Sequence, residues 1–153
     1  MIMHISFKGD YALKAVLDLA LHYNMGVVPI QDIAQRGDMP VKFLEQILLH
    51  LKKAGLVNSK RGVGGGYYLS KDPSEVTVGL VLRLVEGGIA PIACVSKDRY
   101  QPCEDEARCA LKPVWERVHG AISGIVDNAT FAELVETAKE MLSEKPSSPM
   151  YYI

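Results

Sequence analysis

The sequence predicts a mainly α-helical chain with one small β-hairpin in its first half. Three observations indicate this fold class. Helix-forming residues without internal Gly or Pro fill residues 10–23. Two short strand-like runs flank a glycine-rich turn within residues 56–70, and an apolar stripe at helical spacing runs through residues 111–126. The length of 153 residues fits one compact domain, or a small domain with an oligomerisation arm, and excludes a large two-domain enzyme.

Composition narrows the class of protein further. The hydrophobic content of 48% is normal for a folded chain and argues against global disorder. No apolar run reaches the roughly 18 residues of a membrane span. Lys8 and Asp10 come too early for the apolar region of a secretory signal, so we expect a cytoplasmic protein without a membrane partner.

Charge is divided unevenly along the chain, although the net charge is −1. Residues 1–71 carry nine Lys/Arg against five Asp/Glu, whereas residues 72–153 carry eight against thirteen. Residues 41–71 hold six basic groups and a single acid, Glu45. This balance predicts a basic surface that binds a polyanion in the first half of the chain, and a different function in the second half.

The first half is expected to contain three helices. The first, residues 10–23, is apolar on nearly all faces and should lie between other elements, ending near Gly26. A short helix at about Ile30–Arg36 follows, then a Gly-containing turn at residues 37–40 and a longer helix from about Val41 to Ala54. Two helices joined by a tight turn fit a helix-turn-helix, and they also fit any αα-corner.

The longer helix divides into two faces, which favours the helix-turn-helix. At 100° per residue, one face is apolar and comprises Leu44, Ile47, Leu48 and Leu51. The opposite face is polar and comprises Lys42, Glu45, Gln46 and Lys53, with Leu49 the one apolar residue among them. Polar residues near the start of such a helix read base edges in a major groove, so we predict a recognition helix. The alternative is an ordinary solvated face.

Residues 56–70 predict a hairpin directly after this helix. Its strands are Leu56–Lys60 and Tyr67–Ser70, and four of the residues between and beside them are Gly62, Gly64, Gly65 and Gly66. A nucleotide-binding loop is the alternative, but Gly-Lys-Ser/Thr and a following helix are missing. A basic hairpin after a recognition helix is a wing, and Arg61, with Lys60 beside it, could enter a narrow minor groove. Residues 1–87 are therefore predicted to form a winged helix-turn-helix DNA-binding domain.

The second half is expected to sense and to dimerise. A short apolar helix at residues 78–86 completes the winged domain, and residues 88–110 form a loop without periodicity. Residues 111–145 should form dimerisation helices, the last opened by a capping box of Thr130 and Glu133. Packing within the monomer is the alternative for their apolar stripe. The tail, residues 146–153, is predicted to be flexible.

All three cysteines, Cys94, Cys103 and Cys109, lie in the loop of residues 88–110, which we call the cysteine loop. Soft thiolates presented together suit zinc, copper(I) or an iron–sulfur cluster. Zinc sites usually use closer cysteine pairs and four protein ligands, and no His lies inside this loop. Three thiolates with a fourth ligand from elsewhere fit an iron–sulfur cluster better, while a thiol-redox switch needs only two of them.

Several segments together resemble the Rrf2 family of bacterial winged-helix regulators, the IscR/NsrR type. They are KGDYALKAVLDLAL, FLEQILLHLKKAGLV, RGVGGGYYLS, and the three cysteines followed by a helix with Trp115. The resemblance covers about residues 3–142. It implies a homodimer that binds a palindromic DNA operator and senses through an iron–sulfur cluster held by three cysteines, here Cys94, Cys103 and Cys109. The matching DNA-contact positions here are Lys42, Glu45, Gln46 and Arg61.

The fourth cluster ligand departs from one branch of that family. Where the IscR branch has a His three residues after the last cysteine, this chain has Lys112, and a protonated lysine has no lone pair to give. In the branch resembling NsrR, a carboxylate on the first helix of the partner subunit completes the site, and the aligned residue is Asp10. Asp10 could instead serve only as a first-turn charge or cap of its helix. We expect [2Fe-2S] in preference to [4Fe-4S], with both types open.

These observations predict a homodimeric DNA-binding transcriptional regulator that senses redox, nitric oxide or iron–sulfur status through an iron–sulfur cluster. Lys52, Lys53 and Lys60 should contact phosphates without choosing sequence. The alternative is a clusterless winged-helix regulator switched by thiol oxidation or a protein partner. An enzyme is not expected, because no Ser/His/Asp set, paired carboxylates or nucleotide motif is present, and neither is a small-molecule substrate.

Overall fold

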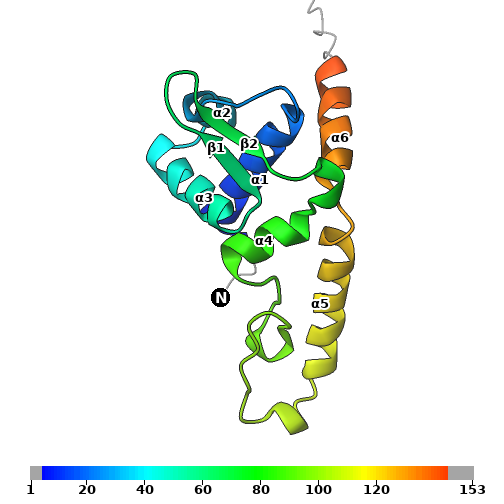
Figure 1. Cartoon of the computed structure of the whole chain (residues 1–153). Helices are drawn as coiled ribbons and strands as arrows, with labels where there is room; N and C mark the ends of the chain where they lie inside the picture. The colour runs from blue at the N-terminus through cyan, green and yellow to red at the C-terminus, as the bar shows by residue number, and fades with distance from the viewer. Residues whose placement is uncertain (1–4, 145–153) are drawn as a thin grey trace, which may run out of the picture.

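The computed structural model describes residues 5–144 and confirms the mainly α-helical fold with a two-stranded antiparallel sheet. Figure 1 shows α1, α2, α3 and the hairpin as a compact head with α6 beside it. Helix α5 lies below α6, beyond the head, and α4 lies between the head and α5 (Figure 1). The helices are α1 (Phe7–Leu21), α2 (Ile30–Gly37), α3 (Val41–Lys53), α4 (Val78–Glu86), α5 (Lys112–Val126) and α6 (Phe131–Ser143). The strands are β1 (Val57–Lys60) and β2 (Gly66–Leu69), and the short 3-10 turns are η1 (Pro73–Glu75), η2 (Ala93–Val95) and η3 (Glu106–Arg108). The predicted tail, residues 146–153, lies outside the described residues.

Helix α1 is the central element of the head, as its all-round apolar pattern predicts. It begins at Phe7, three residues earlier than expected, because the Ser6 hydroxyl caps it by accepting a bond from the Gly9 N–H at 3.1 Å. It ends at Leu21, two residues earlier than expected. Helices α2, α3, α4 and α6 all pack against it. Its fully or nearly buried apolar side chains are Ala12, Ala15, Val16, Leu19 and Ala20.

The helix-turn-helix is formed by α2 and α3, within one residue of the predicted bounds. Asp38 ends α2 in the left-handed region at φ 50°, and the buried Met39 closes the turn through a bond from its N–H to the Ala34 carbonyl at 2.9 Å. The predicted core face of α3 is confirmed, since all four members are fully buried: Leu44, Ile47, Leu48 and Leu51. Arg36 of α2 donates two hydrogen bonds to the nearly buried Asp18 of α1, which fixes α2 on the core.

The wing is the hairpin of β1 and β2, in a register that pairs Val57 with Leu69 and Lys60 with Gly66. A bridge between Val28 and Tyr67 also joins β2 to the chain before α2, with both backbone bonds at 2.8 Å. Gly66 is required at this junction, because a Cβ there would collide with the carbonyl of Val28. The wing is therefore fastened through β2 to the segment that leads into the helix-turn-helix.

The C-terminal helices pack differently from each other. Helix α6 returns to the head, where Phe131 is fully buried and Val135 nearly so. Its start is fixed by the bond from the Phe131 N–H to the Val76 carbonyl at 2.8 Å and by the predicted capping box, which is present. Helix α5 buries only His119. Within residues 5–144, no helix is both long enough and apolar enough to cross a membrane.

Candidate nucleic-acid interface and cysteine loop

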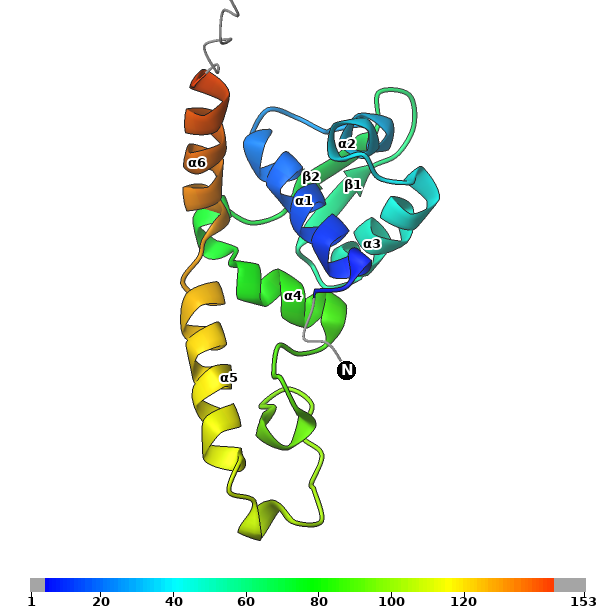
Figure 2. The same cartoon turned by 180° about the vertical axis from the view of Figure 1, so that it is seen from behind.

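The polar face of α3 is open to solvent. Its exposed polar members, which we call the reading face, are those that the sequence singled out: Lys42, Glu45, Gln46 and Lys53. Because the opposite face is buried, these side chains point outward, and Figures 1 and 2 show that α3 lies beside the hairpin. A helix with this exposure can enter a DNA major groove, which is about 12 Å wide.

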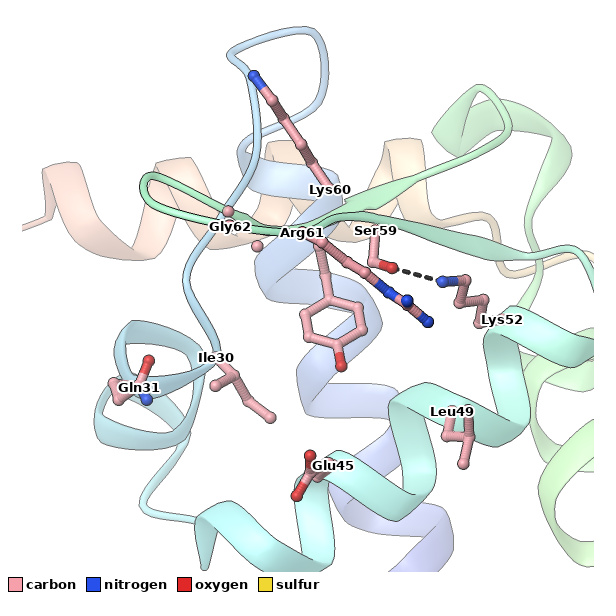
Figure 3. A pocket seen from close by; sticks show the side chains of 12 residues that line it. Ile30, Gln31, Glu45, Leu49, Lys52, Ser59, Lys60, Arg61 and Gly62 are labelled. Atoms are coloured by element: carbon pink, nitrogen blue, oxygen red, sulfur yellow. Dashed lines mark hydrogen bonds between the residues drawn. The ribbon is translucent and has the colours of Figure 1, made fainter.

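A groove of about 390 Å³ runs between α3 and the wing. Figure 3 shows its lining, which includes Glu45 and Leu49 from α3 and Ile30 from the start of α2. Across it, the Lys52 ammonium donates to the hydroxyl of Ser59 at 2.6 Å, so Lys52 joins α3 to β1. The Lys52 ammonium, which the sequence predicts to contact phosphate, is therefore hydrogen-bonded within the chain.

The two basic residues of the wing differ in direction. Arg61 extends over the groove toward α3, whereas Lys60 points away from it (Figure 3). Both are exposed, and Gly62 and Gly64, at φ 94° and 71°, form the tight tip beyond them. The wing therefore presents one cation beside the recognition helix and another on its outer side.

The cysteine loop connects α4 to α5 and carries the three thiols at separate points. All three are free; Cys94 lies in η2 and Cys109 directly follows η3, both partly buried, while Cys103 is exposed. Within residues 5–144, no three His, Cys, Asp or Glu side chains are grouped so that they could hold a metal ion. The chain thus brings the cysteines into one loop but not into one metal-binding group.

Glu106 fastens the cysteine loop to the start of α5. Its carboxylate accepts hydrogen bonds from the Lys112 ammonium at 2.5 Å and from the Tyr100 hydroxyl at 2.7 Å. The Lys112 bond, with the Tyr100 bond, lowers the pKa of Glu106 below its usual value, and the pairing raises the pKa of Lys112. Lys112 is therefore held as a cation, which agrees with its exclusion as a ligand.

Asp10, the predicted partner-subunit ligand, lies in the first turn of α1. Its carboxylate pairs with Lys14, one turn along, at 2.7 Å, and both side chains are about half exposed (48% each). The hydrogen bond to Asp10 raises the pKa of Lys14. In its own chain Asp10 therefore has the first-turn role that sequence analysis gave as the alternative, and it remains open to solvent.

Arg83 of α4 is an organising residue that sequence analysis did not single out. Its guanidinium makes a two-point ion pair with Asp127, at the end of α5, and reaches Asp98 of the cysteine loop at 3.3 Å. The next residue, Leu84, accepts a bond from the His50 ring of α3 at 2.6 Å. Helix α4 therefore touches the recognition helix, the cysteine loop and α5. The sequence does mark this residue, because Arg83 is the only charged residue within the apolar run of residues 78–85.

Known proteins resemble the chain over most of its length. Residues 5–137 match the profile of the Rrf2 family, described as an iron-dependent transcriptional regulator. The HTH-type transcriptional regulator IscR of Serratia proteamaculans is 42% identical over 87% of this chain and 79% of its own length. IscR of Photobacterium profundum is 39% identical over 87% of this chain and 76% of its own.

Solved structures agree with these matches. IscR of T. potens has a TM-score of 0.75 at 34% identity, covering 97% of this chain and 96% of that one. CymR of B. subtilis, described as its global cysteine regulator, has a TM-score of 0.76 at 33% identity, covering 89% and 98%. The winged head and these matches lead to one conclusion. The chain belongs to the Rrf2 family, whose members are transcriptional regulators and not enzymes.

Proposed function

We propose that this protein is a cytoplasmic, homodimeric regulator that binds a palindromic DNA operator and senses redox, nitric oxide or iron–sulfur status through an iron–sulfur cluster. One observation carries the proposal. Helix α4 is bonded both to α3, which bears the exposed reading face, and to the cysteine loop, which holds all three thiols. An element shared by the two sites gives a physical route by which a signal at the loop can change DNA binding.

DNA recognition is supported by the exposed reading face and the cations beside it. All five of these residues are exposed, and in our proposal Lys42, Glu45 and Gln46 meet base edges while Lys53 and Lys60 meet phosphates. Arg61 borders the same groove from the wing. A second copy of the head would read a second half-site one helical turn or more away.

Dimerisation is supported by apolar side chains that the monomer leaves uncovered. They lie on α5, on α6 and just before α5, and more than 45% of each is exposed: Leu111, Val114, Ile125, Met141 and Leu142. The rest of the predicted stripe, Trp115, Val118 and Ile122, is only partly buried. A second copy of the chain would remove this apolar surface from water. Light scattering should give the mass of a dimer; a monomer at micromolar concentration would contradict the proposal.

Cluster binding is supported by the donor chemistry of the loop. Three free thiols without a competing disulfide are the ligands that iron–sulfur clusters use. A cluster there would supply reversible oxidation and a target for nitric oxide. In our proposal Cys94, Cys103 and Cys109 come from one subunit and Asp10 from the partner subunit. Among the described residues the three thiols are not grouped, so binding a cluster would require the cysteine loop to draw them together. We prefer [2Fe-2S] to [4Fe-4S].

The clusterless alternative is favoured by one specific observation, the exposure of Cys103 as a free thiol. A thiol in that position can be oxidised without any metal. This alternative predicts a colourless protein even after anaerobic purification, with DNA binding that responds to a thiol oxidant.

Anaerobic purification of the full chain, followed by a visible spectrum and iron and sulfide analysis, separates the two. The cluster proposal predicts colour, iron and sulfide, and their loss in Cys103→Ala; a colourless, iron-free wild type overturns it. Asp10→Ala should weaken the cluster. Lys14→Ala is the matched control, because it breaks the same ion pair and keeps the carboxylate. Equal cluster stability in both variants would remove Asp10 as a ligand.

A gel-shift titration tests DNA binding separately. Arg61→Ala should weaken operator binding about tenfold if Arg61 enters a groove of the DNA. Lys71→Ala is the control, because Lys71 is exposed but does not line the groove beside α3. Unchanged affinity in Arg61→Ala would count against a DNA contact by the wing.

A further inference from the structure

We infer that Leu49 is a sequence-reading residue, whose side chain contacts the C5-methyl group of a thymine in the major groove. The inference rests on the proposed DNA-binding role of α3 and deepens it. Sequence analysis noted Leu49 only as an apolar exception on a polar face. The structure places this exception at the centre of that face.

The position of Leu49 on α3 is unlike that of the other aliphatic residues in the middle of the helix. Leu44, Ile47, Leu48 and Leu51 are fully buried, whereas 51% of Leu49 is exposed. At 100° per residue, Leu49 lies about 20° from Lys42 and about 40° from Glu45 around the helix axis. It therefore points in the same direction as the residues proposed to read DNA.

The surroundings of Leu49 indicate a ligand rather than a missing protein contact. It lines the groove between α3 and the wing, together with Glu45, Lys52 and Arg61 (Figure 3). These three neighbours are charged, and although Ile30 and Tyr67 line the same groove, they leave half of Leu49 exposed. A helix lying in the major groove through this face would bring Leu49 to the base edges one turn beyond Glu45.

The chemistry of the major groove identifies the ligand. Thymine alone among the four bases presents a methyl group there, and apolar side chains recognise it by contact. Leucine offers no hydrogen bond, so it cannot read the other bases by donors and acceptors. Contact would remove both the leucine δ-methyls and the thymine methyl from water. We therefore expect each half-site to contain an A·T pair whose thymine faces Leu49.

Replacing thymine by deoxyuridine deletes this methyl group and leaves base pairing unchanged. The test begins with an operator selected from a random library by the wild-type protein. Synthetic copies then carry deoxyuridine at one thymine position at a time, in both half-sites. At one position, deoxyuridine in place of thymine should weaken binding by the wild type about fourfold per half-site, because one methyl group is no longer buried. With both half-sites substituted, the dimer should bind about fifteenfold more weakly.

The variant Leu49→Ala should bind the thymine and deoxyuridine operators equally at that position. Alanine is a better helix former than leucine and the site is exposed, so α3 should remain folded, as circular dichroism can verify. Lys42→Ala is the matched control on the same face. It should weaken binding to both operators and keep their ratio.

Two results separate the inference from the proposed function. If the wild type selects no DNA at all, the proposed function fails and the role of Leu49 fails with it. If the wild type binds its operator but tolerates deoxyuridine at every position, or if Leu49→Ala keeps the full thymine preference, only the assignment of Leu49 is overturned.

Discussion

Phe131→Ala should weaken the packing of helix α6 against the winged head and so lower the stability of the fold. Phe131 is the first residue of α6 and is fully buried, although it lies 45 residues beyond the last residue of α4. Truncating a fully buried phenylalanine costs about 3–5 kcal/mol, because it removes apolar contacts and leaves a cavity. Domains are typically stable by only about 5–15 kcal/mol, so this loss is about a fifth of the total or more. The melting temperature should fall by roughly 10 °C.

Urea unfolding followed by circular dichroism measures this loss, at one fixed protein concentration because the proposed dimer makes stability concentration-dependent. Val63→Ala is the control: Val63 is fully exposed at the wing tip and its truncation should change stability by less than about 0.5 kcal/mol. A loss below about 1 kcal/mol for Phe131→Ala would refute the reasoning. It would mean that α6 does not close the core of the head.

Three further predictions follow from the charged groups. Arg36→Met leaves the nearly buried Asp18 without its two hydrogen-bond donors and should lower the free energy of unfolding by about 1.5–3 kcal/mol. Urea unfolding measures this loss, and unchanged stability would contradict the buried pairing. Arg83 holds the pKa of Asp127 below its ordinary 3.8, so this pair should stabilise the fold at neutral pH and weaken as pH falls through the lowered pKa. In a carboxylate NMR titration, Arg83→Gln should return that pKa toward 3.8, and an unmoved titration would rule out the ion pair as its cause. Lys60→Ala should reduce the slope of log affinity against log salt by about 0.9 per subunit, and an identical slope would exclude a phosphate contact.

The head could be predicted almost completely from the sequence, because its elements follow local rules. Helical periodicity predicts the buried positions of α3, and the hairpin forms on either side of its glycine turn; the buried residues are Leu44, Ile47, Leu48 and Leu51. The start of α1 was misplaced because Ser6 caps it through a single side-chain bond. The pattern of apolar residues marks the body of a helix and carries no information about that bond.

The C-terminal half was less predictable, because its arrangement depends on contacts between residues far apart in the chain. The capping box marked the start of α6 correctly, but nothing local shows that Phe131 enters the core of the head. The same applies to Arg83, whose partners Asp98 and Asp127 are 15 and 44 residues away. In the proposed dimer, which apolar residues of α5 face the second chain also depends on that chain.

The attachment of the wing at Gly66 and Val28 limits how a regulator of this shape can respond to a signal. The hairpin is bonded to itself, to the segment before α2 and, through Lys52 and Ser59, to α3, so wing and α3 are held in one arrangement. In the proposed dimer, a change in the cysteine loop is therefore expected to leave the bases that one head prefers unchanged. It would instead alter the distance and angle between the two heads, and with them the spacer between half-sites that the dimer accepts.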